Sequence, residues 1–207
     1  MRHLALGLLL TGCAGFVDAV GFIELGGFYT SFMSGNTTQL GTGMIMSEPV
    51  LLPLGLVAMF FFGSFLGSLL ALRGTRWGSS LVLCFVIATV ALTLSLSLAG
   101  IPASQAMLVL AAGAGAQNAT LPFTGGARLG TTFVSGTLFS AGQDLAGAFA
   151  GKVPRWRWVQ QLSVWCSLLL GAFVGSVAHS VLDVTAIIVP GAIYVAMLVW
   201  FSLRPLA

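Results

Sequence analysis

The chain has 207 residues, of which 57% are hydrophobic and only 6% are charged, and its mean hydropathy is +1.03. A soluble domain carries about 25% charged residues, so this composition excludes a water-soluble globular protein. The formal net charge of +3 gives no indication of nucleic-acid binding, and the eight basic residues fall between apolar runs, where they set membrane topology. We therefore expect an all-α polytopic membrane protein in the lipid bilayer, with no nucleic-acid partner.

Six apolar runs are each long enough to cross a bilayer, at residues 4–23, 51–72, 79–99, 103–121, 159–180 and 184–203. The first run contains LTGC at Leu10 to Cys13, which is similar to a lipoprotein cleavage box. Because the run continues past Cys13 to Ile23, we expect an uncleaved membrane span.

Two further segments, 29–47 and 130–150, are more polar. The first contains the phrase TSFMSGNTT, from Thr30 to Thr38, and the second contains TTFVSGTLF, from Thr131 to Phe139. Neither segment is suited to face lipid along its whole length. We predict that both are broken or re-entrant helices beside six full spans; the alternative is that both cross, which gives eight crossings.

Three blocks of sequence occur twice in the same order. GFVDAV matches GAQNAT, TSFMSGNT matches TTFVSGTL, and FGSFLGS matches LGAFVGS, at offsets of 100, 101 and 108 residues. Such collinear matches indicate an internal duplication. We predict two related membrane repeats, residues 1–100 and 101–207.

The orientation of the repeats depends on the two polar segments. If both re-enter, each half has three spans, all eight basic residues fall on one side, and the halves are inverted relative to each other. The positive-inside rule favours this arrangement, with both termini cytoplasmic, and inverted repeats with broken helices are a known transporter plan. If both cross, Arg73, Arg76 and Arg128 lie opposite the other basic residues, and the repeats are parallel.

The two polar phrases carry the candidate substrate-binding residues. In lipid, their hydroxyl and amide groups need partners, so they are expected to face protein or a water-filled cavity. If the backbone unwinds at Gly35, free N–H groups at a helix N-terminus favour an anion or a carboxylate. We expect the phrases to meet near the midplane, through Thr30, Ser31, Ser34, Gly35, Asn36 and Thr37 of the first half and Thr131, Thr132, Ser135, Gly136 and Thr137 of the second. The alternative is that these small residues only pack helices.

Ionisable and amide residues inside the apolar runs extend the candidate site. Asp18 lies deep in the first span, where a carboxylate is costly and indicates a function, such as binding a solute or carrying a proton. Its counterpart in the second half is Asn118, preceded by Gln117. Asp144 is a second candidate for proton linkage, although it equally suits a solvated position at the cytoplasmic mouth.

Other residue patterns predict structure rather than chemistry. The pairs Gly63/Gly67 and Gly171/Gly175 have the four-residue spacing that lets helices pack closely, between the halves or in a homodimer. The three cysteines are far apart and form no metal-ligand pattern, and no nucleophile or nucleotide-binding motif is present. We expect no metal, no cofactor and no enzymatic activity, with an intramembrane enzyme acting on a lipid as the weakest alternative.

The stretch GFVDAVGFIELGGFYTSFMSGNTTQLG, residues 15–41, resembles the N-terminal signature of the YoaK-like family of bacterial transmembrane proteins. That signature has an Asp in the first span and then an aromatic stretch ending in Met-Ser/Thr-Gly-Asn. This chain has Asp18, Phe28, Phe32, Met33, Ser34, Gly35 and Asn36. The family's Gln-Asn-Ala matches residues 117–119, and its Thr-Thr-x-x-Ser/Thr-Gly-Thr phrase matches Thr131, Thr132, Ser135, Gly136 and Thr137.

The chain also departs from that family. Where similar proteins continue with Thr-Asp-Leu-Gly, this chain has Phe-Ser-Ala-Gly at 139–142, and Asp144 comes later, so the family's acidic role is not carried over to it. The resemblance implies a bacterial inner-membrane protein and names no substrate. We expect a secondary transporter or channel for a small polar solute; the alternative is a non-transport membrane scaffold or assembly protein.

Overall fold

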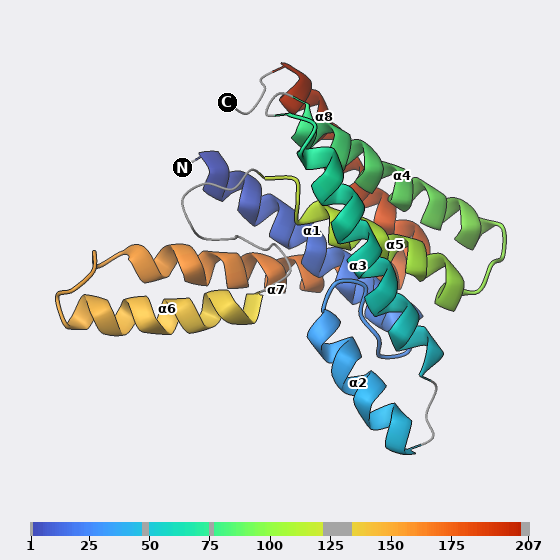
Figure 1. The fold of residues 1–207 in the computed structure, drawn as a ribbon, viewed down its shortest axis with the longest axis horizontal. Helices are drawn as coiled ribbons and strands as arrows, with labels where there is room; N and C mark the ends of the chain where they lie inside the picture. The colour runs from blue at the N-terminus through green and yellow to red at the C-terminus, as the bar shows by residue number, and fades with distance from the viewer. Residues whose placement is uncertain (1, 47–49, 75–76, 122–133, 204–207) are drawn as a thin grey trace.

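The computed structural model describes residues 2–46, 50–74, 77–121 and 134–203 (Figure 1). These residues form a bundle of helices. In chain order the elements are α1 (Arg2–Glu24), α2 (Met33–Met46), α3 (Leu51–Ala71), α4 (Gly78–Leu98), α5 (Ala103–Gln117), α6 (Val134–Phe149), α7 (Arg157–Leu182), the 3-10 helix η1 (Asp183–Ile187) and α8 (Ile188–Leu203).

Helix ends follow local sequence signals. α4 ends in a Schellman turn: Gly100 has φ of 79°, the Ile101 N–H donates to the Leu96 carbonyl, and the Gly100 N–H donates to the Ser97 carbonyl. Pro102 follows as the N-cap of α5. The break between α1 and α2 lies at 25–32, where Gly26 and Gly27 have φ of 63° and 113°. This break therefore precedes Gly35. We expected Gly35 to interrupt the helix, but it lies inside α2.

Four helical stretches among the described residues are long and apolar enough to cross a membrane: Leu4–Glu24, Leu51–Ala71, Gly78–Leu98 and Arg157–Leu203. The last has 47 residues and contains α7, η1 and α8, which correspond to two of the predicted runs. The predicted run 103–121 is helical only over the 15 residues of α5. α2 and α6 have 14 and 16 residues, or about 21 and 24 Å, against about 30 Å of hydrocarbon.

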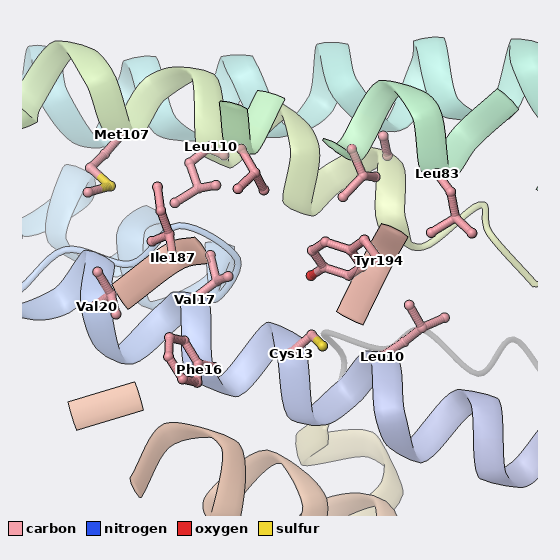
Figure 2. Packing of buried hydrophobic residues seen from close by; sticks show 14 of the residues in the cluster. Leu10, Cys13, Phe16, Val17, Val20, Leu83, Met107, Leu110, Ile187 and Tyr194 are labelled. Carbon is pink, nitrogen blue, oxygen red and sulfur yellow. The ribbon is translucent and has the colours of Figure 1, made fainter. Parts of the chain in front are cut away.

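α5 lies in the centre of the bundle, and ten of its fifteen residues are buried. It is made largely of Ala and Gly, so neighbouring helices can approach its backbone. The core also contains Val17 and Val20 of α1, Met107 and Leu110 of α5, and Ile187 of η1 (Figure 2).

The long helices pack across the two halves of the chain. α1 of the first half lies along α7 of the second, and α5 of the second half lies along α3 of the first. α4 also packs against α5 and α8. The helices that follow α1 and α5 lie outside this core: α2 contacts α3, and α6 contacts α7 (Figure 1).

The glycines of the two small-residue pairs lie at these cross-half contacts. A Cβ added to Gly63 would come within 1.9 Å of the Ala112 carbonyl oxygen, and one added to Gly171 within 2.0 Å of the Gly12 carbonyl oxygen. Gly67 lies in the same way against Ala116, and Gly175 against Phe16. The backbones at both contacts are too close for any side chain larger than hydrogen.

α1 and α5 run in opposite directions. The C-terminal part of α5 lies beside the N-terminal part of α1, since the Gln117 side chain donates a hydrogen bond to the Leu10 carbonyl and Gly7 lies against Leu121. The N-terminal end of α1 and the C-terminal ends of α3 and α8 point toward one end of the bundle (Figure 1). The C-terminal ends of α1 and α4 point toward the other.

Candidate functional site

The Asp18 carboxylate joins α1 to the residues that lead into α2. Its Oδ1 accepts hydrogen bonds from the Ser31 backbone N–H at 2.6 Å and from the Thr30 hydroxyl at 3.0 Å. Its Oδ2 accepts a third from the Ser31 hydroxyl at 2.6 Å. Thr30 and Ser31 are buried, at 0% and 3% exposure. Hydrogen bonds to a charged group are about twice as strong as neutral ones, so this carboxylate holds the start of α2 against α1.

The Asn36 side chain, at the start of α2, bonds back to the backbone of the same segment. Its Oδ1 accepts the Tyr29 backbone N–H at 2.9 Å, and its Nδ2 donates to the Tyr29 carbonyl at 2.6 Å. The side chain is fully buried. The amide therefore satisfies both backbone groups of a half-buried, non-helical residue, as a neighbouring strand would.

Glycine allows close packing around this turn. A Cβ at Gly35 would lie 2.6 Å from the Phe32 ring, and one at Gly21 would lie 2.6 Å from the Thr30 methyl. The Tyr29 ring packs against Phe22 and Phe32, with centroids 5.0 and 5.1 Å apart. The phrase that follows Asp18 is thus a tightly packed turn.

The remaining predicted residues of the first phrase face outward. Ser34 and Thr37 are exposed on α2. The Thr37 hydroxyl donates to the Met33 carbonyl of its own helix at 2.8 Å. Gln39, which was not among the predicted site residues, donates from Nε2 to the Gly27 carbonyl at 2.9 Å and closes the other side of the turn.

The structure does not bring the second phrase to the first, so the prediction that they meet is wrong for the described residues. Ser135 and Gly136 are exposed at the start of α6, and the Thr137 hydroxyl donates to the Val134 carbonyl at 2.7 Å. Because α6 packs on α7 and α2 packs on α3, the core helices separate α2 from α6. Thr131 and Thr132 lie outside the described residues.

A polar cluster that sequence reasoning found only in part lies in the bundle centre. Gln117 of α5, 2% exposed, donates from Nε2 to the Leu10 carbonyl of α1 at 2.9 Å and accepts from the Tyr194 hydroxyl of α8 at its Oε1. Tyr194 was missed, although a tyrosine in the middle of the last apolar run was a signal for a buried polar contact. Asn118, next to Gln117, donates back to the Ala114 carbonyl at 3.3 Å.

A small cavity adjoins this cluster. It has a volume of about 10 Å³, enough for about one water molecule, and Thr89, Gln117 and Tyr194 contribute its polar groups. Its lining residues come from the middle of α1, α4 and α8 and from the C-terminal half of α5: they include Ala14, Val86, Leu110 and Gly113. Cys13 and Tyr194 lie near each other beside it (Figure 2).

Two ion pairs lie away from the centre. Asp144 of α6 is 3.3 Å from Arg157 at the start of α7, which gives this carboxylate a local partner. Glu24 at the end of α1 is 2.7 Å from His179 Nε2 near the end of α7. In the part of the chain that the structure describes, no group of three or more His, Cys, Asp or Glu residues could hold a metal ion.

Comparisons with known proteins identify the family. The family described as "Protein of unknown function (DUF1275)" matches residues 6–200. The chain is 30% identical over 176 residues to UPF0700 transmembrane protein RA0705 of Rhizobium meliloti (strain 1021). The aligned region covers 84% of this chain and 75% of that protein. The chain is also 30% identical over 147 residues to UPF0700 transmembrane protein YoaK of Bacillus subtilis (strain 168). That aligned region covers 67% of this chain and 65% of that protein.

No solved structure matches the chain. The apolar helices and the transmembrane relatives confirm a helical, multi-pass membrane protein. The motifs around Asp18 and Gln117, the match over residues 6–200 and the two relatives lead to one conclusion: the chain belongs to the YoaK-like DUF1275 family of transmembrane proteins of unknown function.

Proposed function

We propose that the protein is a secondary transporter or channel for a small polar solute, built from two inverted repeats, residues 1–100 and 101–207. The observation that carries the proposal is the correspondence of the cross-half contacts. Gly63 on Ala112 and Gly171 on Gly12 are the same contact with the halves exchanged, because residues 63 and 12 of the first half correspond to 171 and 112 of the second. Inverted repeats that enclose a central site are a recurrent plan of transporters.

A second pair of contacts supports the same correspondence. Gly15 lies against the Leu168 carbonyl, and a Cβ there would be 2.2 Å from its oxygen; Gly115 lies against the Phe60 carbonyl, at 2.1 Å. The offsets between these residues are again 100 and 108. The opposite directions of α1 and α5 support inversion of the halves rather than parallel repeats.

We assign six crossings to α1, α3, α4, α5, α7 and α8. α2 and α6 lie outside the core, where each packs on a single helix, and do not cross. Arg73, Lys152, Arg155 and Arg157 then fall on one side, together with the N-terminal end of α1 and the C-terminal end of α8. By the positive-inside rule this side is cytoplasmic, in the inner membrane of a bacterium.

The cavity beside Gln117 and Tyr194 is our candidate for the midplane site. Asp18 follows the cavity residue Ala14 along α1, and Asn118 follows the cavity residue Gln117 at the end of α5. Because α1 and α5 run in opposite directions, Asp18 and Asn118 lie on opposite sides of the cavity. Polar groups therefore occur in the outer half, the centre and the inner half of the bundle. A small polar solute needs such a series of partners to cross hydrocarbon.

The alternative is a scaffold or assembly protein that transports nothing. It is favoured by the bonding of Asp18 and Asn36, whose polar atoms are engaged within α1 and the turn before α2. An inverted duplication has no evident purpose in such a protein, so the transporter remains our conclusion.

Water access to Cys13 distinguishes the two functions. In proteoliposomes, the variant Cys84→Ala/Cys166→Ala keeps one thiol, buried at the bundle centre. A channel or an alternating-access transporter admits a charged, membrane-impermeant methanethiosulfonate reagent to this thiol from both sides. A scaffold leaves Cys13 unlabelled, while Lys152→Cys in the cysteine-free chain is still labelled from one side; that result would contradict the proposal.

A further inference from the structure

A groove lies at the turn between α6 and α7, away from the bundle centre. It has a volume of about 460 Å³ and is open to the outside. Its lining residues are Leu145, Ala148 and Phe149 near the end of α6, and Arg155, Trp156 and Trp158 around the start of α7. Nothing in the proposed transport path uses these residues.

One wall of the groove is apolar and exposed. Leu145, Ala148 and Phe149 are spaced so that they share a face of α6. Phe149 is 86% exposed and Trp156 is 76% exposed, so both side chains are free to contact lipid. Tryptophan beside the start of a membrane-crossing helix is typical of the boundary between headgroups and acyl chains.

The rim of the groove is cationic. Lys152, Arg155 and Arg157 occur within six residues. Asp144 pairs with Arg157. Among the described residues, no carboxylate forms an ion pair with Lys152 or Arg155. An exposed positive charge is thus left directly beside an apolar wall.

We propose that this groove binds one anionic phospholipid of the surrounding membrane. Its phosphate pairs with Arg155, with Lys152 nearby, and its glycerol and upper acyl region lie on Trp156, Trp158 and the α6 face. The cations select an anionic headgroup, because a basic pocket at the cytoplasmic end of membrane helices attracts negative lipid. The apolar wall selects a lipid over a soluble anion, because the acyl chains of a lipid can pack on Phe149 and Trp156 and a free phosphate has none.

The test uses native mass spectrometry of the delipidated full chain in detergent. The protein is offered equal amounts of phosphatidylglycerol and phosphatidylcholine with the same acyl chains. Wild type is expected to retain phosphatidylglycerol in preference by about fivefold or more. Arg155→Gln is expected to retain both lipids about equally. The control is Arg73→Gln, which removes an exposed charge outside the groove and is expected to keep the preference.

Two competition arms separate the lipid from other anions and locate the contact. Inorganic phosphate and glycerophosphoglycerol, which lacks acyl chains, are expected to displace little bound phosphatidylglycerol; equal displacement would overturn the assignment to a lipid. Brominated phosphatidylglycerol is expected to quench less tryptophan fluorescence in Trp156→Leu/Trp158→Leu than in Trp77→Leu/Trp200→Leu. Equal retention of both lipids by wild type, or an equal loss of preference in Arg73→Gln and Arg155→Gln, would also overturn it.

Discussion

In the first half of the chain, Asn36 is buried and bonds the backbone of Tyr29, whereas Thr137, at the matching place in the second half, donates to the Val134 carbonyl of its own helix turn. By contrast, the glycine contacts of α3 and α7 are equivalent in the two halves. The packing of the halves thus agrees, while the polar residues at these two matching positions differ.

The largest effect is expected where the halves agree. Gly63→Ala and Gly171→Ala each place a Cβ about 2 Å from a backbone carbonyl oxygen of another helix, so that two rigid backbones must separate. We expect each change to lower the free energy of unfolding by about 3 kcal/mol or more, or to prevent folding. Unfolding by heat or SDS in detergent measures it. Gly41→Ala, where nothing lies within 4 Å, is the control and is expected to be neutral or slightly stabilising. A large effect at only one of the two glycines would break the equivalence.

A smaller loss of stability is expected from changes in the two polar phrases, where the halves differ. Asn36→Ala leaves the N–H and carbonyl of the half-buried Tyr29 without the amide and opens space at a buried side chain, at a cost of about 2–3 kcal/mol. Thr137→Ala removes one bond on its own helix turn and is expected to cost less than about 1 kcal/mol. The same unfolding assay compares them. Equal losses would mean that the second phrase is also a packed turn.

Asp18 and Asn118 give the next comparison. Asp18→Asn keeps the size of the side chain but replaces one acceptor oxygen by an NH₂ group, which cannot accept the bonds that the carboxylate takes from Ser31 and Thr30. We expect a loss of about 1.5–2 kcal/mol, together with faster proteolysis between α1 and α2. Asn118→Ala, the matched change in the second half, removes the bond to the Ala114 carbonyl and is measured in the same assay. No loss in Asp18→Asn would show that the carboxylate does not hold α2.

The smallest effect is expected at the bundle centre, where Gln117 corresponds to the apolar Val17 of the first half. Tyr194→Phe removes a single hydroxyl donor from the Gln117 Oε1, and we expect about 1 kcal/mol of destabilisation. If the cavity binds solute, this variant also weakens the thermal stabilisation that a ligand gives to wild type, which is about 2.7 kcal/mol at 100 times its dissociation constant. Tyr29→Phe removes the other tyrosine hydroxyl of the chain and is expected to leave that response unchanged.

Much of the helix pattern could be predicted from residues alone. The apolar runs 51–72 and 79–99 differ from α3 and α4 by a single residue at their ends, because length and hydropathy are local properties and Gly100 marks a stop by its backbone. The polar segments 29–47 and 130–150 were correctly separated from the long spans, since α2 and α6 are short. The run 103–121 was predicted too long, because composition alone does not show that α5 ends at Gln117.

The sequence by itself determined that this chain lies in a membrane, which segments are helical, and which glycines permit close contact, because each follows from the chemistry of neighbouring residues. Only the tertiary structure decided that α1 lies along α7 and α3 along α5, and that α2 and α6 lie apart. It also decided that the carboxylate of Asp18 and the amide of Asn36 form hydrogen bonds with the turn before α2, and that Tyr194 bonds Gln117 at the centre. The physical reason is that a small residue or a polar group signals a need for a close partner, and the identity of that partner depends on helices far away in the chain.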